Sequence, residues 1–121
     1  MGVDIDPKAE DIARENAAYN GFSSPEFTAL TGNVTADKSM MRSLAASHYD
    51  VVLVNIVADV IIGLAPVLPN FLDESSIVIL SGILDSRLAD VEAALRAAGL
   101  LILSRREMEE WRCICARRGN V

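Results

Sequence analysis

Apolar and polar residues follow two periodicities along this chain, and the two alternate. Short apolar runs bounded by turn residues predict strands at residues 2–5, 26–30, 49–56, 76–82, 100–108 and 110–118. Between them, apolar residues recur three or four positions apart, which predicts helices over 7–20, 38–47, 58–68 and 85–98. Strands that alternate with helices in this way are typical of an α/β protein.

The two middle strands differ in composition from the last two. "YDVVLVNI" and "SIVILSG" are almost continuously apolar, as expected of parallel strands covered on both faces. "LLILSRREM" and "EWRCICARR" follow each other after a short break, which predicts an antiparallel pair. We therefore predict one domain over residues 1–121, built on an open, mostly parallel sheet with an antiparallel last strand.

The first predicted helix has well-marked boundaries. Asp6 can accept hydrogen bonds from the free N–H groups at its start, and Pro7 occupies the first turn, where a missing N–H costs little. Gly21, just after Asn20, is a typical C-terminal stop, and Gly99 ends the last helix in the same way.

The composition and charge of the chain limit the kinds of molecule that we expect it to bind. The chain has 121 residues, of which 51% are hydrophobic, and its net charge is −6. A protein that binds the phosphate backbone normally carries the opposite charge, so we expect no direct contact with nucleic acid. The longest apolar stretch, 51–68, is interrupted by Asn55, Asp59, Gly63 and Pro66, and no basic-then-apolar leader opens the chain. We expect no membrane segment and a cytoplasmic location.

Several reactive residues are assigned no function. Cys113 and Cys115 lie two apart on one face of a strand, too badly oriented to bridge each other and too few for a zinc site. They are interpreted as reduced core thiols, and no metal is expected. His48 has no obvious partner. The acidic residues before Trp111 are interpreted as a solvated turn anchored by a buried tryptophan.

Polar residues follow the strands of the predicted sheet, where open α/β sheets bind their ligands. Asp4 ends the first strand and could accept both hydroxyls of a ribose, although a solvated strand end is the plainer interpretation. Asn33 follows the second strand after a glycine, and could meet a base edge or simply shape a turn. Ser81 and Gly82 follow the fourth strand.

Asn55 is the most informative of these polar residues. An amide that ends a strand of Val, Leu and Ile is costly to bury unless it is hydrogen-bonded. Its oxygen could accept a hydrogen bond from a substrate amine. A structural tie to a loop backbone is an equally good interpretation from the residues alone.

Several motifs together resemble one family. "GVDIDPKAEDIARENAAYNG", "DVVLVNIVA", "LSGIL" and "EEW" occur in the order found in the PrmA-type ribosomal protein methyltransferases, and the resemblance runs from residue 2 to about 117. It implies a Rossmann-like class I methyltransferase sheet, methyl transfer from S-adenosylmethionine, and amino groups of ribosomal protein L11 as acceptors. The chain would correspond to strands two to seven of that sheet.

The resemblance also implies roles for the polar rim. Asp4 would hold the cofactor ribose, Asn33 would lie near the adenine, and Asn55 would be the catalytic residue between cofactor and substrate amine. "NIVA" stands where the family usually has "NILA". Relatives that methylate glutamine or DNA bases have an Asn-Pro-Pro-aromatic motif here, so they fit less well.

The first strand of the family's sheet and its glycine-rich loop have no counterpart in this sequence. We therefore expect weak or no cofactor binding by the chain alone, and exposed edges on strands two and four. Those strands would either pair directly or pair across a homodimer. An inactive, self-associating fragment is the alternative to an active enzyme. A nicotinamide-dinucleotide domain is disfavoured by the antiparallel final hairpin and by the missing dinucleotide fingerprint.

Overall fold

The computed structural model describes residues 1–119, which form two compact units, 1–41 and 42 onward. The expectation of one domain over the whole chain stays a prediction.

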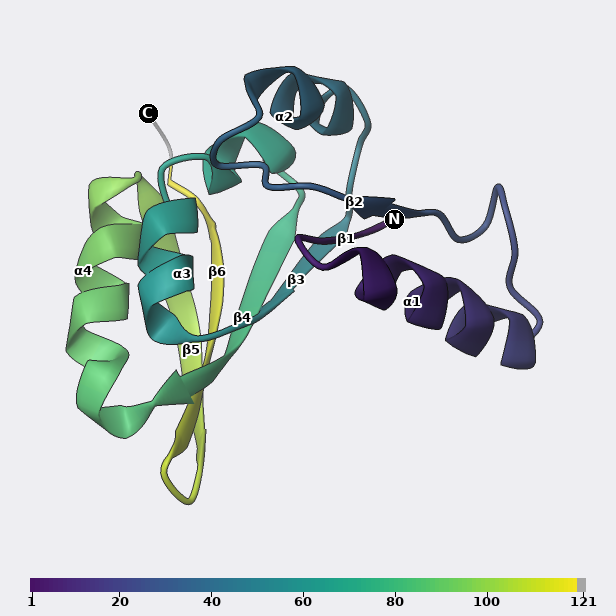
Figure 1. Ribbon diagram of the computed structural model, residues 1–121. Helices are drawn as coiled ribbons and strands as arrows, with labels where there is room; N and C mark the ends of the chain where they lie inside the picture. Colours follow the sequence, from purple (N-terminus) through teal and green to yellow (C-terminus); the bar gives the residue numbers. More distant parts are fainter. Residues whose placement is uncertain (120–121) are drawn as a thin grey trace. The chain divides into compact units, whose positions relative to one another are not determined.

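The first unit is a small parallel sheet with one helix. β1 (Gly2–Asp4) and β2 (Ala29–Thr31) pair in parallel, and α1 (Pro7–Tyr19) connects them and packs on both (Figure 1). The Asp6 carboxylate accepts a hydrogen bond from the Lys8 N–H at 2.9 Å, which confirms Asp6 as the cap of α1. α1 buries none of its residues, so this unit has little core.

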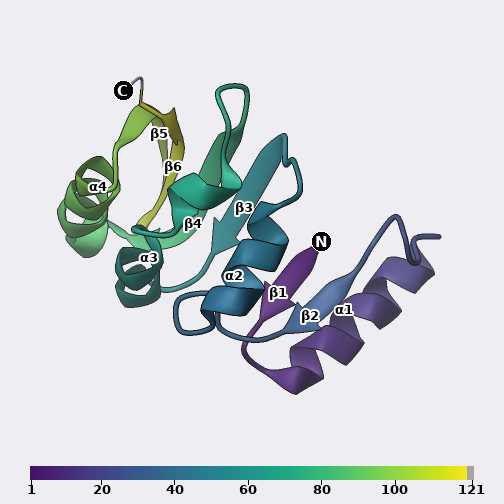
Figure 2. The same ribbon diagram turned by 90° about the horizontal axis from the view of Figure 1, so that it is seen from above.

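The second unit is a four-stranded sheet. It begins within α2 (Lys38–Ala45) and continues with β3 (Val51–Asn55), α3 (Ala58–Leu64), the short helix η1 (Leu68–Phe71), β4 (Ile77–Leu84), the short helix η2 (Asp85–Arg87), α4 (Leu88–Ala97), β5 (Leu100–Met108) and β6 (Trp111–Arg118). The strand order is β3-β4-β6-β5. β3 and β4 are parallel, whereas β6 is antiparallel to both of its neighbours, as Figure 2 shows. The predicted fold class and the antiparallel hairpin are confirmed.

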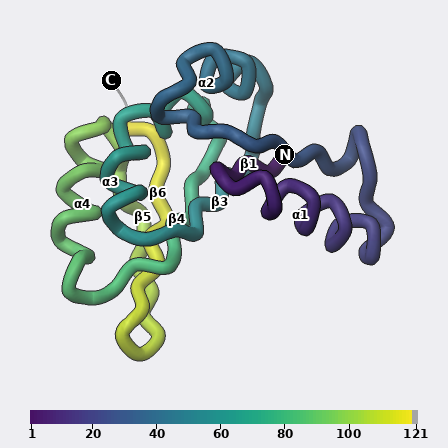
Figure 3. Tube along the Cα trace, viewed as in Figure 1, coloured from purple at the N-terminus to yellow at the C-terminus, as the bar shows by residue number. Residues whose placement is uncertain are grey.

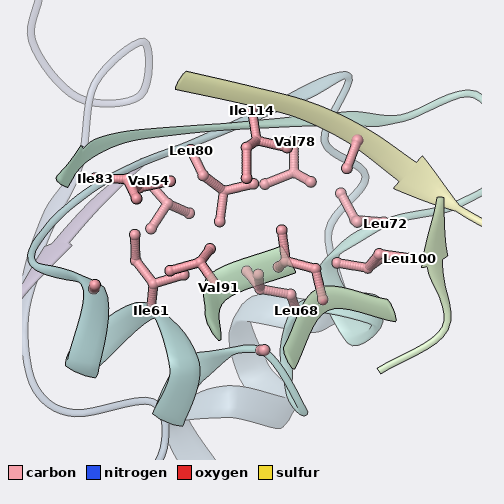
Figure 4. Close-up of a cluster of buried hydrophobic side chains, with 14 residues drawn as sticks. Val54, Ile61, Leu68, Leu72, Val78, Leu80, Ile83, Val91, Leu100 and Ile114 are labelled. Carbon is pink, nitrogen blue, oxygen red and sulfur yellow. The ribbon is translucent and has the colours of Figure 1, made fainter. Parts of the chain in front are cut away.

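The core lies between this sheet and the helices α3 and α4 (Figure 4). Ile61 of α3 and Val91 and Leu95 of α4 are fully buried against Leu80 of β4 and Ile114 of β6. α4 supplies its apolar residues at helical spacing, so one of its faces meets the sheet. This packing holds the carboxyl ends of β3 and β4 in place.

Burial of the middle strands differs from the prediction. Leu53 is 74% exposed and Val51 is 49% exposed, so β3 is not covered on both faces. In β4, buried residues alternate with half-buried ones, which again means that one face is the better covered. The reason is that β3 lies at the edge of its sheet and the core helices pack on one face of it.

Some strands and helices begin or end at other residues than the sequence predicts. The second strand is shorter and later than predicted, at Ala29–Thr31, because a turn occupies the residues around Pro25. The third helix ends at Leu64, shortly before Pro66, and its expected last turn is the separate η1. Figure 3 traces the course of the chain and the long hairpin of β5 and β6.

Candidate functional site

The first part of the candidate site lies where β1 and β2 end. Asp4 pairs with Thr31 in register, and the Gly32 N–H donates to the Asp4 carbonyl at 2.9 Å. The chain therefore brings Asp4 close to the turn that contains Asn33. One carboxylate oxygen of Asp4 accepts a hydrogen bond from the Asp6 N–H at 2.9 Å. The other oxygen has no protein partner among residues 1–119, and the side chain is exposed.

Asn33 shapes the turn after β2. Its Oδ1 accepts from the Thr35 N–H at 3.0 Å and from the Thr35 hydroxyl at 2.5 Å. This is an Asx turn, the ordinary structural use of asparagine. The side-chain NH2 group makes no hydrogen bond within the described chain, so it can still donate to a ligand.

Asn55 ends β3 in the second unit, opposite Ser81 of β4. The side chain is exposed and makes no hydrogen bond to any described residue, so the structural tie to a loop backbone is not present. The register of β4 against β6 shifts between Leu80 and Ile83, which places Ser81 and Gly82 in a bulge. Bulges of this kind often re-aim a side chain beside a functional site.

Gly82 makes room for the Asn55 amide. Its φ of +78° is strained for any residue with a side chain. A Cβ added there would lie 2.8 Å from Asn55 Oδ1 and 3.4 Å from the Ile56 carbonyl oxygen. Glycine therefore lets the bulge approach the amide closely. The sequence showed Gly82 after a strand but gave no sign that it touches Asn55.

A small cavity of about 150 Å³ adjoins this arrangement. Gly82 lines it, together with Val57, Leu84 and Trp111. Trp111 is 45% exposed, so the predicted buried tryptophan is wrong. Trp111 faces Leu84 across the β4–β6 ladder, and that pairing positions the ring at the cavity. Only this tertiary pairing shows that Trp111 belongs to the site.

Ion pairs fix the charged residues around the cavity. Arg87 contacts Asp59 at 2.6 Å and Asp90 at 3.2 Å. The hydrogen bond from Arg87 lowers the pKa of the Asp59 carboxyl, and the same bond raises the pKa of Arg87. Arg112 contacts Asp85 at 3.1 Å and donates to the Glu109 carbonyl at 2.7 Å. The acidic turn before Trp111 is thus held by Arg112.

A second cavity, of about 250 Å³, lies at the opposite ends of the strands, where residues 45–49 and 70–73 precede β3 and β4. His48 lines it and contacts two carboxylates, Asp50 at 2.8 Å and Asp73 at 2.5 Å. The view that His48 lacks a partner is therefore wrong. Asp73 follows His48 by many residues, so only the fold brings them together.

The described residues contain neither a disulfide nor a metal-binding cluster of three or more side chains. Cys113 and Cys115 are free and half-buried. Across residues 1–119, no group of three His, Cys, Asp or Glu side chains is arranged to hold a metal ion. No helix in that part of the chain is long and apolar enough to cross a membrane.

The polar rim fits part of an S-adenosylmethionine molecule. Asp4 offers a free carboxylate oxygen at a strand end, which suits ribose hydroxyls, and Asn33 offers an amide donor. The glycines of this sequence occur singly, so none forms a Gly-x-Gly loop for close approach to the methionine part. The residues present therefore fit the nucleoside end of the cofactor and not the whole of it.

The fold is that of the class I methyltransferases, as comparison of this chain with solved structures shows. The crystal structure of ribosomal protein L11 methylase from Lactobacillus delbrueckii subsp. bulgaricus matches 98% of the chain with a TM-score of 0.82 and 27% identity, and 56% of that protein is covered. An S-adenosylmethionine-dependent methyltransferase from Clostridium acetobutylicum matches with a TM-score of 0.76 at 10% identity, over 98% of this chain and 74% of that one, and so shows the fold alone.

Sequence comparison narrows the class to one family. The family model described as ribosomal protein L11 methyltransferase (PrmA) matches residues 1–119, so the chain belongs to that family. The ribosomal protein L11 methyltransferase of Agathobacter rectalis is 35% identical over 118 residues, which is 98% of this chain. The match covers 36% of that relative, so the chain spans about a third of the length of such proteins. The resemblance inferred from the motifs is confirmed.

Proposed function

We propose that this chain contributes to methyl transfer from S-adenosylmethionine to amino groups of a ribosomal protein. The observation that carries the proposal is the free amide of Asn55, held at the carboxyl end of β3 over a glycine bulge in a member of this family. Family membership supplies the acceptor, because the relatives are named for ribosomal protein L11. Such a substrate is consistent with a cytoplasmic protein.

Asn55 would position the acceptor amine. Its Oδ1 can accept a hydrogen bond from the amine, which orients the nitrogen lone pair. When bound, S-adenosylmethionine supplies an electrophilic methyl group. The acceptor amine, oriented by Asn55, would take this methyl group in exchange for a proton lost to water, and the electron pair of the former carbon–sulfur bond would stay on sulfur. Asn55 is therefore proposed as the catalytic residue.

Asp4 and Asn33 would hold the nucleoside part of the cofactor. The free oxygen of Asp4 is available to ribose hydroxyls, and the Asn33 NH2 group can donate to an acceptor on the base. Asn55 would also border the cofactor. Because no glycine-rich loop is available for the methionine part, we expect the affinity of this chain alone to be weak.

Calorimetric titration of the purified chain with S-adenosylhomocysteine tests the proposal. We expect weak but saturable binding that Asp4→Asn reduces at least tenfold, because the free carboxylate oxygen becomes an amide. Asp11→Asn is the matched control, since Asp11 is an exposed carboxylate on α1. No binding by a folded chain would instead favour the alternative, an inactive fragment of such an enzyme.

A further inference from the structure

Cys113 and Cys115 lie on the face of the sheet that points away from α3 and α4. They flank Ile114 of β6, which is fully buried in the core between the sheet and these helices. Successive side chains of a strand point to opposite faces, so both thiols lie on the other face. Both are free and half-buried, and neither belongs to the core cluster. Their interpretation as core thiols is therefore wrong, and both remain partly accessible.

The neighbouring strands give the two thiols an apolar side and a cationic side. Cys115 is opposite Ile79 of β4, and Cys113 is opposite Arg106 of β5. Side chains directly opposite each other have Cβ atoms about 4.5–5.5 Å apart and share one face of the sheet. Arg106 is exposed and makes no hydrogen bond or ion pair with any residue of 1–119. Its positive charge is therefore available to an anionic group formed at the thiols.

The spacing of the two thiols is too wide for a disulfide and suits a bridging ion. The α-carbons of residues two apart on a strand are about 6.4–6.8 Å apart, and their Cβ atoms point the same way. A disulfide needs Cβ atoms about 3.5–4.5 Å apart and sulfur atoms about 2 Å apart. Two metal–sulfur bonds in line, each of about 2.3 Å, separate the sulfur atoms by about 4.6 Å instead. A linear sulfur–metal–sulfur unit therefore spans a gap that a disulfide does not.

The number of available ligands decides which ion fits. Thiolates are soft ligands that favour copper(I), zinc and iron–sulfur clusters. Structural zinc and iron–sulfur clusters need four protein ligands, and no group of three His, Cys, Asp or Glu side chains in residues 1–119 is arranged to hold a metal ion. Copper(I) has a filled d shell and is satisfied by two thiolates in line. Of these metals, copper(I) alone matches the pair.

We propose that Cys113 and Cys115 form a two-coordinate site for copper(I). Each thiol releases one proton to solvent, and each thiolate donates an electron pair to the ion, which stays in the +1 state. Two thiolates and one monovalent cation leave one net negative charge, and Arg106 lies beside it. Arg106 stabilises this charge and is not a ligand. The site is independent of the proposed methyl transfer, because it uses none of the residues assigned to cofactor or acceptor.

Competition with the copper(I) chelator bicinchoninate tests the site, because the coloured chelate loses its colour as the protein removes the ion. The chain is titrated without oxygen and with ascorbate, which keeps copper in the +1 state. We expect saturable uptake of one copper(I) per chain, which an equimolar amount of zinc does not displace. No uptake would overturn the proposal. One ion per two chains would also overturn it, since copper would then bridge two molecules.

Single substitutions locate the bound ion. Cys113→Ser and Cys115→Ser should each weaken copper(I) binding at least a hundredfold, because a single thiolate remains. Met108→Leu is the matched control, since it removes a sulfur atom from an exposed side chain of β5, and it should change binding less than twofold. Circular dichroism checks the fold, and alanine replaces serine in any cysteine variant that is unfolded. Equal binding by a folded cysteine variant and by Met108→Leu would reject the site.

Arg106→Gln tests the role of the neighbouring charge. We expect it to weaken copper(I) binding roughly two- to fivefold, as for an exposed ion pair. Arg96→Gln removes an exposed charge from α4 instead, and should leave binding unchanged. Equal effects of the two substitutions would show that only net charge matters, and would reject the contribution of Arg106.

Discussion

Asn55 keeps a free amide, which lies against Gly82 in the bulge of β4. At most strand ends, an asparagine bonds to nearby backbone and shapes a turn, as Asn33 does with Thr35. Asn55 has no such bond within the described chain and lies against Gly82 instead. The two asparagines therefore differ in how much hydrogen-bonding capacity remains for a ligand. Asn55 retains all of it.

Gly82→Ala should destabilise the chain more than Gly99→Ala. Both glycines have a positive φ, which costs alanine about 1–2 kcal/mol. A Cβ at Gly99 meets nothing within 4 Å, whereas one at Gly82 meets Asn55 Oδ1 at 2.8 Å. We expect the overlap to add about 1–3 kcal/mol to the loss in free energy of unfolding, measured by urea denaturation.

The double variant Gly82→Ala/Asn55→Ala tests the cause of that difference. Removing the amide should recover part of the added loss. Equal losses in Gly82→Ala and Gly99→Ala would show that Asn55 does not press on the bulge in solution.

The loops that precede β3 and β4 are joined by one histidine. His48 Nε2 contacts Asp50, and His48 Nδ1 contacts Asp73. A neutral imidazole has a single N–H, so both contacts are favourable only for the charged ring. Ser76 adds a bond to the Tyr49 carbonyl at 2.5 Å, and Arg118 donates to the Leu72 carbonyl at 3.1 Å nearby. These contacts tie the amino-terminal ends of the two strands together.

The His48 clamp, defined as His48 with Asp50 and Asp73, should make stability depend on pH. The hydrogen bonds to Asp50 and then Asp73 raise the pKa of His48 above 6.5. A raised folded-state pKa gives stability that is fully present below the unfolded value and is lost as pH rises through the folded one. We expect the free energy of unfolding to fall above about pH 6.5, and this fall to be absent in His48→Asn.

Acid conditions act on a different member of the clamp. Hydrogen bonds from Ser75, first of all its hydroxyl, lower the pKa of Asp73, so its contribution is present above the usual carboxyl pKa and is lost in strong acid. Ser75→Ala should shrink that acid loss and leave the change near neutral pH in place. A wild-type curve that is flat from about pH 6 to 9 would contradict the clamp.

β3 lies at the edge of its sheet, where a strand of another chain could pair with it. Its backbone pairs on one side only, with β4, and it presents Leu53 at 74% exposure. Edges of this kind promote pairing with another strand unless charged residues interrupt them. We propose that two copies associate through β3, which keeps the homodimer prediction open.

Leu53→Lys should therefore weaken self-association at least tenfold in sedimentation experiments. Leu103→Lys is the control, because Leu103 is an exposed leucine on β5, the other edge strand of the same sheet. A larger effect of Leu103→Lys would move the interface to β5. A chain that stays monomeric at all concentrations would exclude the homodimer.

Stability should be distributed unevenly between the two units. Among residues 1–41, Ala29 is the only buried hydrophobic residue. The second unit, in contrast, buries side chains from α3, α4 and all of its strands. Local opening costs less where few apolar contacts form. We expect backbone amides of α1 to exchange with deuterium at least about a hundredfold faster than those of β4 and β6. Equal protection would show that the two units open together.

Sequence pattern by itself determined the strand–helix order, the caps at Asp6 and Gly99 and the family, because these depend on local spacing and on motifs. It also proposed Asp4, Asn33 and Asn55 as candidate site residues, since strand ends are visible in the hydrophobic pattern. It did not distinguish Asn33, bonded in its turn, from Asn55, which stays free.

Only the tertiary structure decided which distant residues meet. It inserted β6 between β4 and β5, and so placed Trp111 opposite Leu84 beside the cavity. It also joined His48 to Asp73, and exposed a strand whose composition suggested burial on both faces. The physical reason is the same in each case. Composition sets what a strand can bury, but strand order and register decide which side chains face each other and which face solvent.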